Sequence, residues 1–263
     1  MARTVGPASQ LCTVHQEGVG GHRDVGHAEP MDLRVGGRQL AAAAADLALG
    51  GVCAGCAGSP GLLCSACRAQ LEQPARVLTR RPGGVPVAAT CVYGGPVRHA
   101  VLAHKERGRL ALARPLGDAL SAAVSVWLDP PARGGAATNL QAALVPAPSS
   151  PGAVRRRGQD PLLRIARRAC VTLRRAGFDC TLVPALRHRR RVSDQSGLGL
   201  VARQANLRGS MTIRMGAEAL LAGRRVIIVD DVVTTGATIG ELARVLRAAG
   251  RVPTGAAVIA AAL

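Results

Sequence analysis

Aromatic side chains are nearly absent from this sequence. Among its 263 residues only Tyr93, Trp127 and Phe178 are aromatic, although 48% of the residues are hydrophobic. Alanine, valine, leucine and glycine must therefore fill the core, which favours close packing of helices on a sheet. Proteins that bind single-stranded nucleic acid without sequence preference stack the bases on aromatic side chains. The shortage of such side chains counts against that mode of binding.

Acidic residues are scarce as well, and so is lysine. The chain has 34 basic residues against 16 acidic ones, a formal net charge of +18, and Lys105 is its one lysine. The excess is concentrated in residues 155–214, where fifteen arginines stand beside only three acids. A basic surface of this kind attracts phosphorylated small molecules or nucleic acid. The alternative is a solvated face that only keeps the protein in solution.

Long apolar runs are missing too. No stretch reaches the roughly 18–20 residues that a membrane-spanning helix needs. The apolar run 41–49 is short, contains Asp46 and follows no usual start, so it is not interpreted as a signal peptide. We expect a cytoplasmic protein without a membrane span, and nothing in the sequence indicates its oligomeric state. In a reducing compartment, paired cysteines bind metal more often than they form disulfides.

The order of the expected elements predicts an α/β fold. Beyond residue 139, short apolar strands alternate with helical segments, as they do in a parallel sheet with crossover helices. We expect residues 1–44 to be a disordered or non-native extension with a short helix, with Met31 as an alternative start. A four-cysteine module follows at 45–75, and the α/β domain occupies 86–263, after a Pro- and Arg-rich linker. The strands are predicted at 87–93, 140–145, 181–183, 225–229 and 258–262, and the helices at 96–107, 110–128, 160–176 and 238–249.

Residues 226–238, VIIVDDVVTTGAT, join an apolar run to the start of a helix. The run Val226–Val229 has the length and branching of a strand buried on both faces. Thr238 followed by Glu241 matches a capping box, which predicts that the helix begins at Thr238. Asp230–Ala237 is then a loop at the carboxyl end of a parallel strand, where open α/β sheets bind their ligands.

This loop has the chemistry of a site for a phosphorylated sugar. Thr234, Thr235, Gly236 and Thr238 would place hydroxyls and free backbone N–H groups at a helix start, which attracts anions. Gly236 would let the backbone approach the phosphate without a Cβ atom in the way. The two aspartates would repel a phosphate, so we expect them to accept hydrogen bonds from the neutral hydroxyls of the sugar rather than to meet a second charge. A magnesium ion is a second possible partner. An ordinary turn with two surface acids is the alternative.

Four cysteines form two CxxC pairs, CAGC and CSAC, which are separated by seven residues. Each pair can chelate one ion, and together Cys53, Cys56, Cys64 and Cys67 complete a tetrahedral site of four thiolates. Such a closed zinc site is structural rather than catalytic, and its binding energy would help to fold the short module. A redox-active dithiol pair is the alternative.

The segment VIIVDDVVTTGAT resembles, along its whole length, the phosphoribosyl pyrophosphate (PRPP) signature of type I phosphoribosyltransferases. The resemblance implies an open parallel sheet flanked by helices, preceded here by a small zinc ribbon. It also implies that Asp230 and Asp231 hold the ribose hydroxyls and act in catalysis, while the loop binds the 5′-phosphate. The implied PRPP-binding residues are Asp230, Asp231, Val233, Thr234, Thr235, Gly236, Ala237 and Thr238. Because some members of that superfamily bind PRPP only as regulators, the motif indicates the ligand more firmly than the reaction.

A four-cysteine module ahead of such a domain is similar to the arrangement in the ComF family, which includes competence proteins. Segments 92–120, 144–166 and 187–211 agree with that family, and the resemblance covers about residues 45–263. The sequence departs from the family pattern at Gln159-Asp160 and at Ser193. The first departure puts a substrate contact at that loop in doubt.

The resemblance also implies residues for the leaving group. Candidates for the pyrophosphate site or a closing flap are Lys105, Arg157, Gln195 and Arg203, and a solvated helix position is the alternative for Lys105. A transferase would displace pyrophosphate from C1 of the ribose, with carboxylates near the positive ring and cations, usually with Mg²⁺, near the leaving group. The acceptor is not readable from the sequence. The alternative function is a non-catalytic PRPP-binding or DNA-associated accessory factor in competence and DNA uptake, with nucleic acid or partner proteins as ligands.

Overall fold

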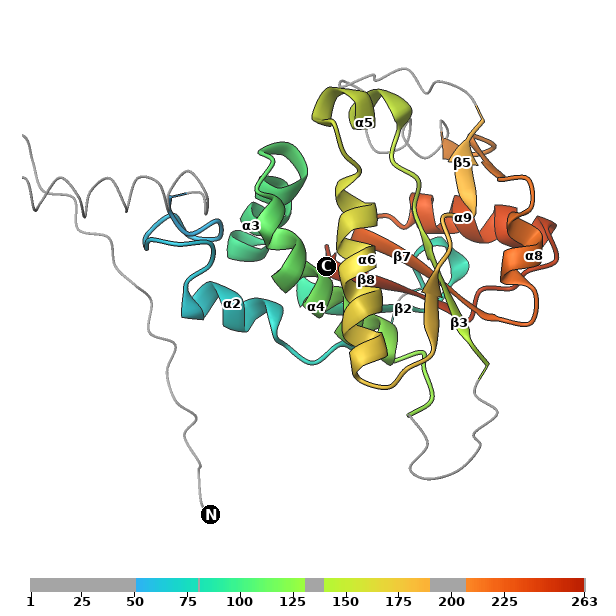
Figure 1. Ribbon diagram of the computed structural model, residues 1–263, viewed down its shortest axis with the longest axis horizontal. Helices are drawn as coiled ribbons and strands as arrows, with labels where there is room; N and C mark the ends of the chain where they lie inside the picture. Colours follow the sequence, from blue (N-terminus) through green and yellow to red (C-terminus); the bar gives the residue numbers. More distant parts are fainter. Residues whose placement is uncertain (1–50, 80, 131–139, 190–206, 263) are drawn as a thin grey trace, which may run out of the picture. The chain divides into compact units, whose positions relative to one another are not determined.

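The computed structural model describes residues 51–79, 81–130, 140–189 and 207–262 (Figure 1). At their centre lies a six-stranded sheet with the order β1-β2-β8-β7-β3-β4, in which every pairing is parallel except that of β1 with β2. This confirms the predicted α/β fold with a mainly parallel sheet. The strands are β1 (Arg76–Val77), β2 (Val87–Val92), β3 (Ala142–Pro146), β4 (Cys180–Leu182), β7 (Arg225–Val233) and β8 (Gly255–Ala261).

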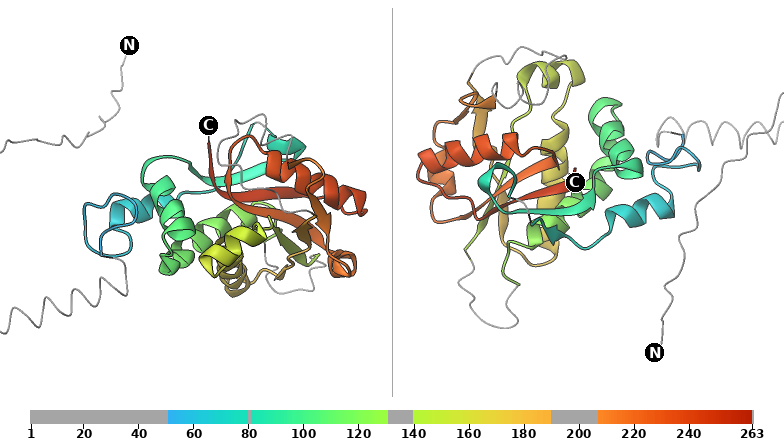
Figure 2. Two further views of the ribbon diagram at one scale, coloured as in Figure 1. Left: turned by 90° about the horizontal axis from the view of Figure 1, so that it is seen from above. Right: turned by 180° about the vertical axis from the view of Figure 1, so that it is seen from behind.

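Helices cover both faces of this sheet, as the two further views show (Figure 2). Successive side chains of a strand point to opposite faces. Val226 and Ile228 of β7 therefore join the apolar cluster that includes α9, whereas Ile227 and Val229 join the one that includes α4 and α6. The helices are α2 (Ser65–Leu71), α3 (Gly95–Glu106), α4 (Ala113–Ser125), α5 (Pro151–Arg157), α6 (Pro161–Arg175), α8 (Ala217–Leu221) and α9 (Ala237–Ala248), with short 3₁₀ turns η1 (Pro82–Gly84) and η2 (Leu110–Leu112).

Two helices beside the carboxyl edge of the sheet begin at a capping side chain followed by proline. The Ala153 N–H donates to the Ser150 hydroxyl at 3.3 Å at the start of α5. The Leu163 N–H donates to the Asp160 carboxylate at 3.0 Å at the start of α6. Both caps satisfy backbone donors that a helix leaves unpaired, and a proline at the first helical position loses no hydrogen bond there.

Two segments that the sequence did not predict as regular structure carry short elements. In the expected linker, β1 pairs with β2 and η1 packs against α9. A second small sheet pairs β5 (Leu186–His188) with β6 (Met211–Ile213) in antiparallel register. Both elements depend on partners far away in the sequence, so local periodicity did not reveal them. The expectations for residues 1–44 lie outside the described part of the chain.

The four-cysteine segment and the sheet share one apolar core. Ala54 and Leu71 are buried in the same cluster as Leu116 and Leu120 of α4. Within the described ranges, no helix combines the length and the hydropathy needed to traverse a lipid bilayer.

Candidate functional site

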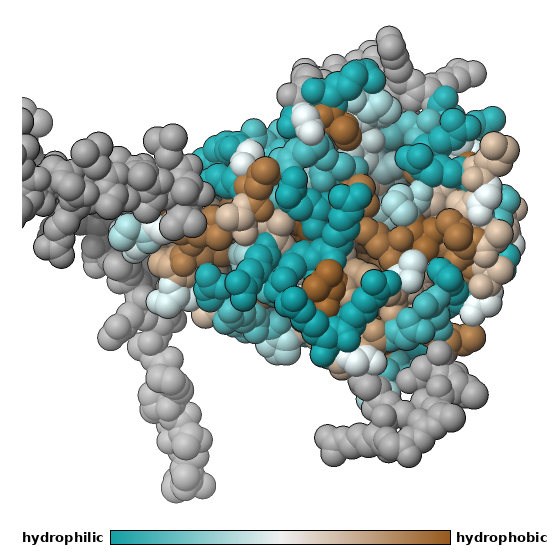
Figure 3. All heavy atoms as spheres, in the orientation of Figure 1, coloured by the Kyte–Doolittle hydropathy of each residue, from teal (hydrophilic) through white to brown (hydrophobic). Residues whose placement is uncertain are grey.

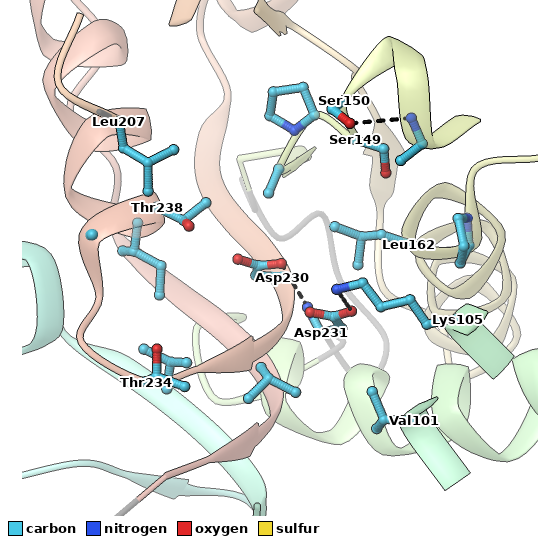
Figure 4. Close-up of a pocket in the computed structure, with 18 of the residues that line it drawn as sticks. Val101, Lys105, Ser149, Ser150, Leu162, Leu207, Asp230, Asp231, Thr234 and Thr238 are labelled. Carbon is cyan, nitrogen blue, oxygen red and sulfur yellow. Dashed lines mark hydrogen bonds and ion pairs between the residues drawn. The ribbon is translucent and has the colours of Figure 1, made fainter. Parts of the chain in front are cut away.

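A cleft of about 610 Å³ opens at the carboxyl edge of the sheet (Figure 4). Its lining includes the whole segment Asp230–Thr238, the loop after β3, the beginning of α6 and part of α3. The sequence thus placed the motif correctly at a ligand-prone edge. Its other walls come from several upstream segments, from α3 to Met211, which are brought together only by the fold.

The two aspartates lie within β7 and not in a loop, so the prediction that the strand ends at Val229 is wrong. β7 continues to Val233, with Asp230 opposite Val258 and Val233 opposite Ala261 of β8. The Asp231 N–H donates to the Asp230 carboxylate at 2.9 Å. Continued pairing with β8 supplies the hydrogen bonds that hold the acids in extended backbone at the sheet edge.

Asp231 has a cationic partner. The Lys105 ammonium lies 2.8 Å from its Oδ2 atom, and the exposed fractions of the two side chains are 40% and 11%. Figure 4 shows Lys105 reaching from α3 towards Asp231. A second charge therefore balances Asp231 in the structure, and the pairing of the acids with sugar hydroxyls stays a prediction. Lys105 lies 126 residues before Asp231 in the sequence, so no local pattern indicated this contact.

Burial affects the protonation of Asp230. It raises the pKa of Asp230 from 3.8 to about 8, and the nearby negative charge of Asp231 acts in the same direction. Burial opposes the charge on Lys105, but the charge and the hydrogen bond of Asp231, together with the other nearby acids, outweigh it and raise the pKa of the ammonium. Asp231 and Lys105 thus form an ion pair, beside which Asp230 holds its proton at neutral pH.

The phosphate-loop candidate is shorter than predicted. Only Thr234–Gly236 separate β7 from α9, which begins at Ala237 with Gly236 as its N-cap at φ 78°. The Thr235 hydroxyl accepts the Ala237 N–H at 3.4 Å. Backbone donors at the start of a twelve-residue helix therefore lie beside small hydroxyl side chains, an arrangement that binds anions.

The predicted capping box of Thr238 and Glu241 is wrong. The Glu241 carboxylate is buried and turns away from the helix start, where it accepts the Met211 N–H at 3.4 Å and pairs with Arg244 at 2.8 Å. The left-handed backbone of Gly236 makes the turn that the box would otherwise have made. Thr238 remains in the cleft lining, as part of the candidate anion site.

Two of the four candidates for the leaving group line the cleft. Lys105 does so from α3, and Arg157 does so from the end of α5, where its guanidinium forms two hydrogen bonds of 2.7 Å to Glu106. Gln195 and Arg203 lie outside the described residues. The arrangement places Lys105 beside Asp231, whereas Arg157 lines the cleft while paired with Glu106.

The loop between β3 and α5, directly after Pro146, also belongs to the site. Ser149 and Ser150 line the cleft, and the Ser149 hydroxyl donates to Asp160 at 2.9 Å. The signal for the beginning of α5 was present in the sequence, because serine followed by proline is typical of a helix start. Asp160, a departure from the ComF pattern, has a structural role as the cap of α6.

The four predicted metal ligands lie together. The sulfur atoms of Cys53, Cys56, Cys64 and Cys67 all lie within 4.8 Å of one another. A tetrahedral zinc ion with bonds of about 2.3 Å would hold its sulfur ligands about 3.8 Å apart, and the Sγ atoms of Cys56 and Cys64 are 3.8 Å apart. The Cys64 N–H donates to Cys53 Sγ at 3.3 Å. The donor set and its spacing fit a four-thiolate metal site.

Cys53, the first cysteine of the cluster, is suited to be a thiolate. Burial alone would raise the pKa of Cys53, but hydrogen bonds from the backbone N–H groups of Cys64, Cys56 and Gly55 lower it to about 6. A thiolate is the form that binds metal. The gathering of four sulfur atoms, rather than of a single pair, favours the metal interpretation over the redox one.

Comparison with known proteins agrees with this geometry. Residues 164–262 match the family model of the phosphoribosyl transferase domain. This segment of the chain is thus similar to a phosphoribosyl transferase domain. The match takes in most of α6, the acid pair and the loop, and it leaves out the cysteine cluster and α3 with Lys105.

Short segments are also similar to curated proteins. One of 52 residues is 46% identical to the adenine phosphoribosyltransferase of Mycobacterium avium, covering 19% of this chain and 29% of that protein. One of equal length is 48% identical to the adenine phosphoribosyltransferase of Mycobacterium tuberculosis, covering 19% and 24%. One of 40 residues is 58% identical to the orotate phosphoribosyltransferase of Xanthomonas axonopodis pv. citri, covering 15% and 18%. The chain spans less than a third of the length of these relatives, and the likeness supports a phosphoribosyltransferase fold.

Proposed function

We propose that this protein binds PRPP or a related ribose-5-phosphate compound in the cleft and transfers phosphoribose to an acceptor, with release of pyrophosphate. The observation that carries the proposal is the arrangement of the acid pair and a helix-start anion site along one continuous segment, Asp230–Thr238. A sugar phosphate carries both groups that such a site would recognise, since it has vicinal hydroxyls at one end and a phosphate at the other.

The roles of the residues follow from charge. The loop Thr234–Gly236 and the first N–H groups of α9 bind the 5′-phosphate, because they offer hydrogen-bond donors and a favourable helix dipole. Asp230 and Asp231 hold the ribose hydroxyls, and the Asp231 carboxylate stabilises the positive charge that grows on the ring as pyrophosphate leaves. Lys105 and Arg157, which line the cleft, are the candidate cations for the leaving group.

Two metals belong to this proposal. Zinc in the four-cysteine cluster is structural, because all four coordination positions of such a site are occupied by protein ligands. Mg²⁺ bound with PRPP would supply charge neutralisation of the pyrophosphate, and the oxygen ligands of Asp230 and Asp231 suit that ion. The remaining catalytic work, which is to position the ribose and exclude water, falls to the residues of the cleft.

Ligand-induced stabilisation tests the site. PRPP with Mg²⁺ at a hundredfold excess over its dissociation constant would add about 2.7 kcal/mol to the stability, or roughly 5–10 °C in melting temperature. The double variant Asp230→Asn/Asp231→Asn should lose this shift. The matched control is Asp118→Asn/Asp129→Asn, which removes two acids outside the cleft lining formed by the described residues and should keep the shift.

The outcomes separate binding from turnover. A full shift in the cleft variant would overturn the site, and no shift in the wild type would overturn PRPP binding itself. Pyrophosphate release in the presence of a panel of nucleobases and amines then tests transfer. Stabilisation without pyrophosphate release from any acceptor would favour a PRPP-binding regulator over a transferase.

A second candidate function is a ComF-like accessory role in competence, with nucleic acid as the partner. It is favoured by the cysteine cluster ahead of the domain and by the exposed arginines of α6, in a hydrophilic part of the surface (Figure 3). These are Arg164, Arg167, Arg174 and Arg175. Binding of single-stranded DNA, titrated with salt, tests it, because phosphate contacts weaken steeply as salt rises. No binding at about 0.15 M salt would remove the nucleic-acid version.

A further inference from the structure

The candidate phosphate loop is supported from behind by a turn that lies about 150 residues upstream in the sequence. In η1, Pro82 and Gly83 pack against Gly236 and the first turn of α9. A Cβ atom built on Gly236 would lie 2.5 Å from the carbonyl carbon of Pro82 and 2.6 Å from the backbone nitrogen of Gly83. Real Cβ atoms do not approach backbone so closely, so the two segments meet main chain to main chain.

The contact is reciprocal. A Cβ atom built on Gly83 would lie 2.5 Å from the carbonyl oxygen of Gly236 and 2.8 Å from the Cα atom of Gly240. Glycines therefore occupy both sides of the interface, at Gly83 on the turn and at Gly236 and Gly240 on the loop and helix. Gly83 also has a left-handed φ of 71°, which favours glycine independently of the contact.

These distances change the reason for the glycine in the TTGAT loop. Its Cβ direction points at Pro82, and Pro82 is not among the described residues that line the cleft. The predicted reason for a glycine here was that a phosphate can approach the backbone freely, and this concerns only the side of Gly236 that faces the cleft. The other side is filled by η1, so the loop is a single layer of backbone between the ligand cleft and the upstream turn.

The turn itself is held in place. Val85, directly after it, is fully buried in the cluster that includes Leu242 and Leu246 of α9. The Gly84 N–H donates to the Arg81 carbonyl at 2.9 Å, and the Gly84 carbonyl accepts from Arg247 at 3.4 Å. An element fixed in this way can fix the backbone that packs on it.

We propose that Gly83 is a positioning residue for the phosphate site: its backbone holds Gly236 and the start of α9 in the conformation whose N–H groups bind the phosphate. The inference rests on the proposed function and adds a residue outside the motif and outside the matched domain. A donor array binds an anion tightly only if the donors are fixed beforehand, so a displaced loop weakens binding even in a folded protein.

The neighbouring glycine supplies a matched control. Gly84 has a φ of 72°, almost the same as that of Gly83, and no heavy atom of the described residues lies within 4 Å of a Cβ built on it. Gly83→Ala and Gly84→Ala therefore introduce the same backbone strain one residue apart, and both should lower the melting temperature by a few degrees. Only Gly83→Ala also pushes on the phosphate loop.

Calorimetric titration with ribose 5-phosphate, and with PRPP and Mg²⁺, well below the melting temperature tests the proposal. Gly83→Ala should weaken binding by at least about tenfold, as displaced binding groups do. Gly84→Ala should stay within about twofold of the wild type, as surface substitutions do. Equal affinities in the two variants would overturn the proposal, whereas failure of the wild type to bind either ligand would overturn the proposed function instead.

Hydrogen exchange in the absence of ligand reads the support directly. Gly83→Ala should speed exchange of the backbone N–H groups of residues 236–240, and Gly84→Ala should not. Unchanged exchange in Gly83→Ala would overturn the positioning role whether or not the wild type binds a sugar phosphate.

Discussion

Lys105 is the side chain that makes an acid pair tolerable inside the cleft. The carboxylate of Asp231 is only 11% exposed, and without a counter-charge it would stand unpaired beside Asp230. Removing one partner of an ion pair that is shielded from water leaves the other charge uncompensated, which costs more than the pair contributes. The lone lysine of the chain thus has a structural role, before any role towards pyrophosphate.

Lys105→Met should lower the free energy of unfolding by about 1–2 kcal/mol, less than a fully buried pair because the ammonium is partly solvated. Denaturant unfolding measures the loss. Arg98→Met removes a positive charge from the exposed face of the same helix and should change stability little. Equal stability of the two variants would show that solvent, and not Lys105, balances Asp231.

Asp230 gives the stability of the protein a pH dependence. Its pKa is about 8 in the native protein and near the ordinary 3.8 in the unfolded chain, so the native state holds the extra proton between these values. Stability from this group is complete below pH 3.8, falls as pH rises through the window and is lost above about pH 8. Asp230→Asn, which stays neutral, should flatten the decline in melting temperature between pH 5 and pH 8 by several degrees.

The control for this prediction is Asp129→Asn. Asp129 is an exposed acid that pairs with Arg225 away from the cleft, and its loss should leave the slope of melting temperature against pH unchanged. A wild-type slope in Asp230→Asn would mean that Asp230 is ionised in the native protein at neutral pH.

At the scale of elements, the junction of β7 with α9 depends on Gly236 and Glu241. Thr238→Ala should change the stability of the ligand-free protein by less than about 0.5 kcal/mol. A capping threonine would cost about 1 kcal/mol. Glu241→Ala should cost about 1–3 kcal/mol, because it leaves the buried Met211 N–H without its acceptor and Arg244 without its partner.

Chemical denaturation without ligand compares the two variants, and Glu241→Gln serves as the control. Glutamine keeps an acceptor for Met211 but loses the charge opposite Arg244, so its stability should fall between wild type and Glu241→Ala. A loss in Thr238→Ala as large as that in Glu241→Ala would restore the capping box.

Local patterns predicted most elements of the sheet domain but not their limits. The apolar runs at β2, β3, β7 and β8 gave the strands, and the helical periods gave α3, α4, α6 and α9. The end of β7 was missed because continued pairing with β8 overrides the low strand preference of aspartate. The sequence from Thr234 to Glu241 fits both a capping box and a glycine cap. The structure has the glycine cap, because Glu241 accepts the Met211 N–H and not an N–H at the helix start.

Within the site, too, local features were predicted and long-range contacts were not. Asp230–Thr238 were predicted because they are contiguous, and the four cysteines because their spacing is set by the ion. The partnership of Lys105 with Asp231 and the support of Gly236 by Gly83 were not, because each joins segments more than a hundred residues apart. Such contacts follow from the fold and leave no periodic signal.

At the scale of the molecule, α3 connects the cysteine cluster with the cleft. Near the beginning of the helix, His99 Nδ1 lies 2.9 Å from the carbonyl oxygen of Gly55, within the first CxxC pair. Near its end, Lys105 contacts Asp231. If the loops that carry the cysteines lose their fixed conformation, the contact of Gly55 with His99 is lost, and the first turns of α3 are affected directly.

Metal removal tests how far the cluster supports the rest. Metal analysis should find about one zinc per chain, and Cys53→Ser should lose it. Cys91→Ser, a buried cysteine outside the cluster whose thiol donates to the Gln70 carbonyl, should retain the metal because a serine hydroxyl can make the same bond.

Hydrogen exchange of the metal-free protein should then separate the cluster from the sheet. Residues 52–71 and the first turn of α3 should exchange faster, because the ion holds the short loops between the cysteines. The N–H groups of β7 and β8 should stay protected, because their two apolar clusters are built mainly around α4, α6 and α9. From the described cluster segment they receive the buried Ala54 and Leu71, with Leu62 and Leu63 packed at the margin. Simultaneous loss of protection in β7 and β8 would contradict this division and make the metal a requirement for the whole fold.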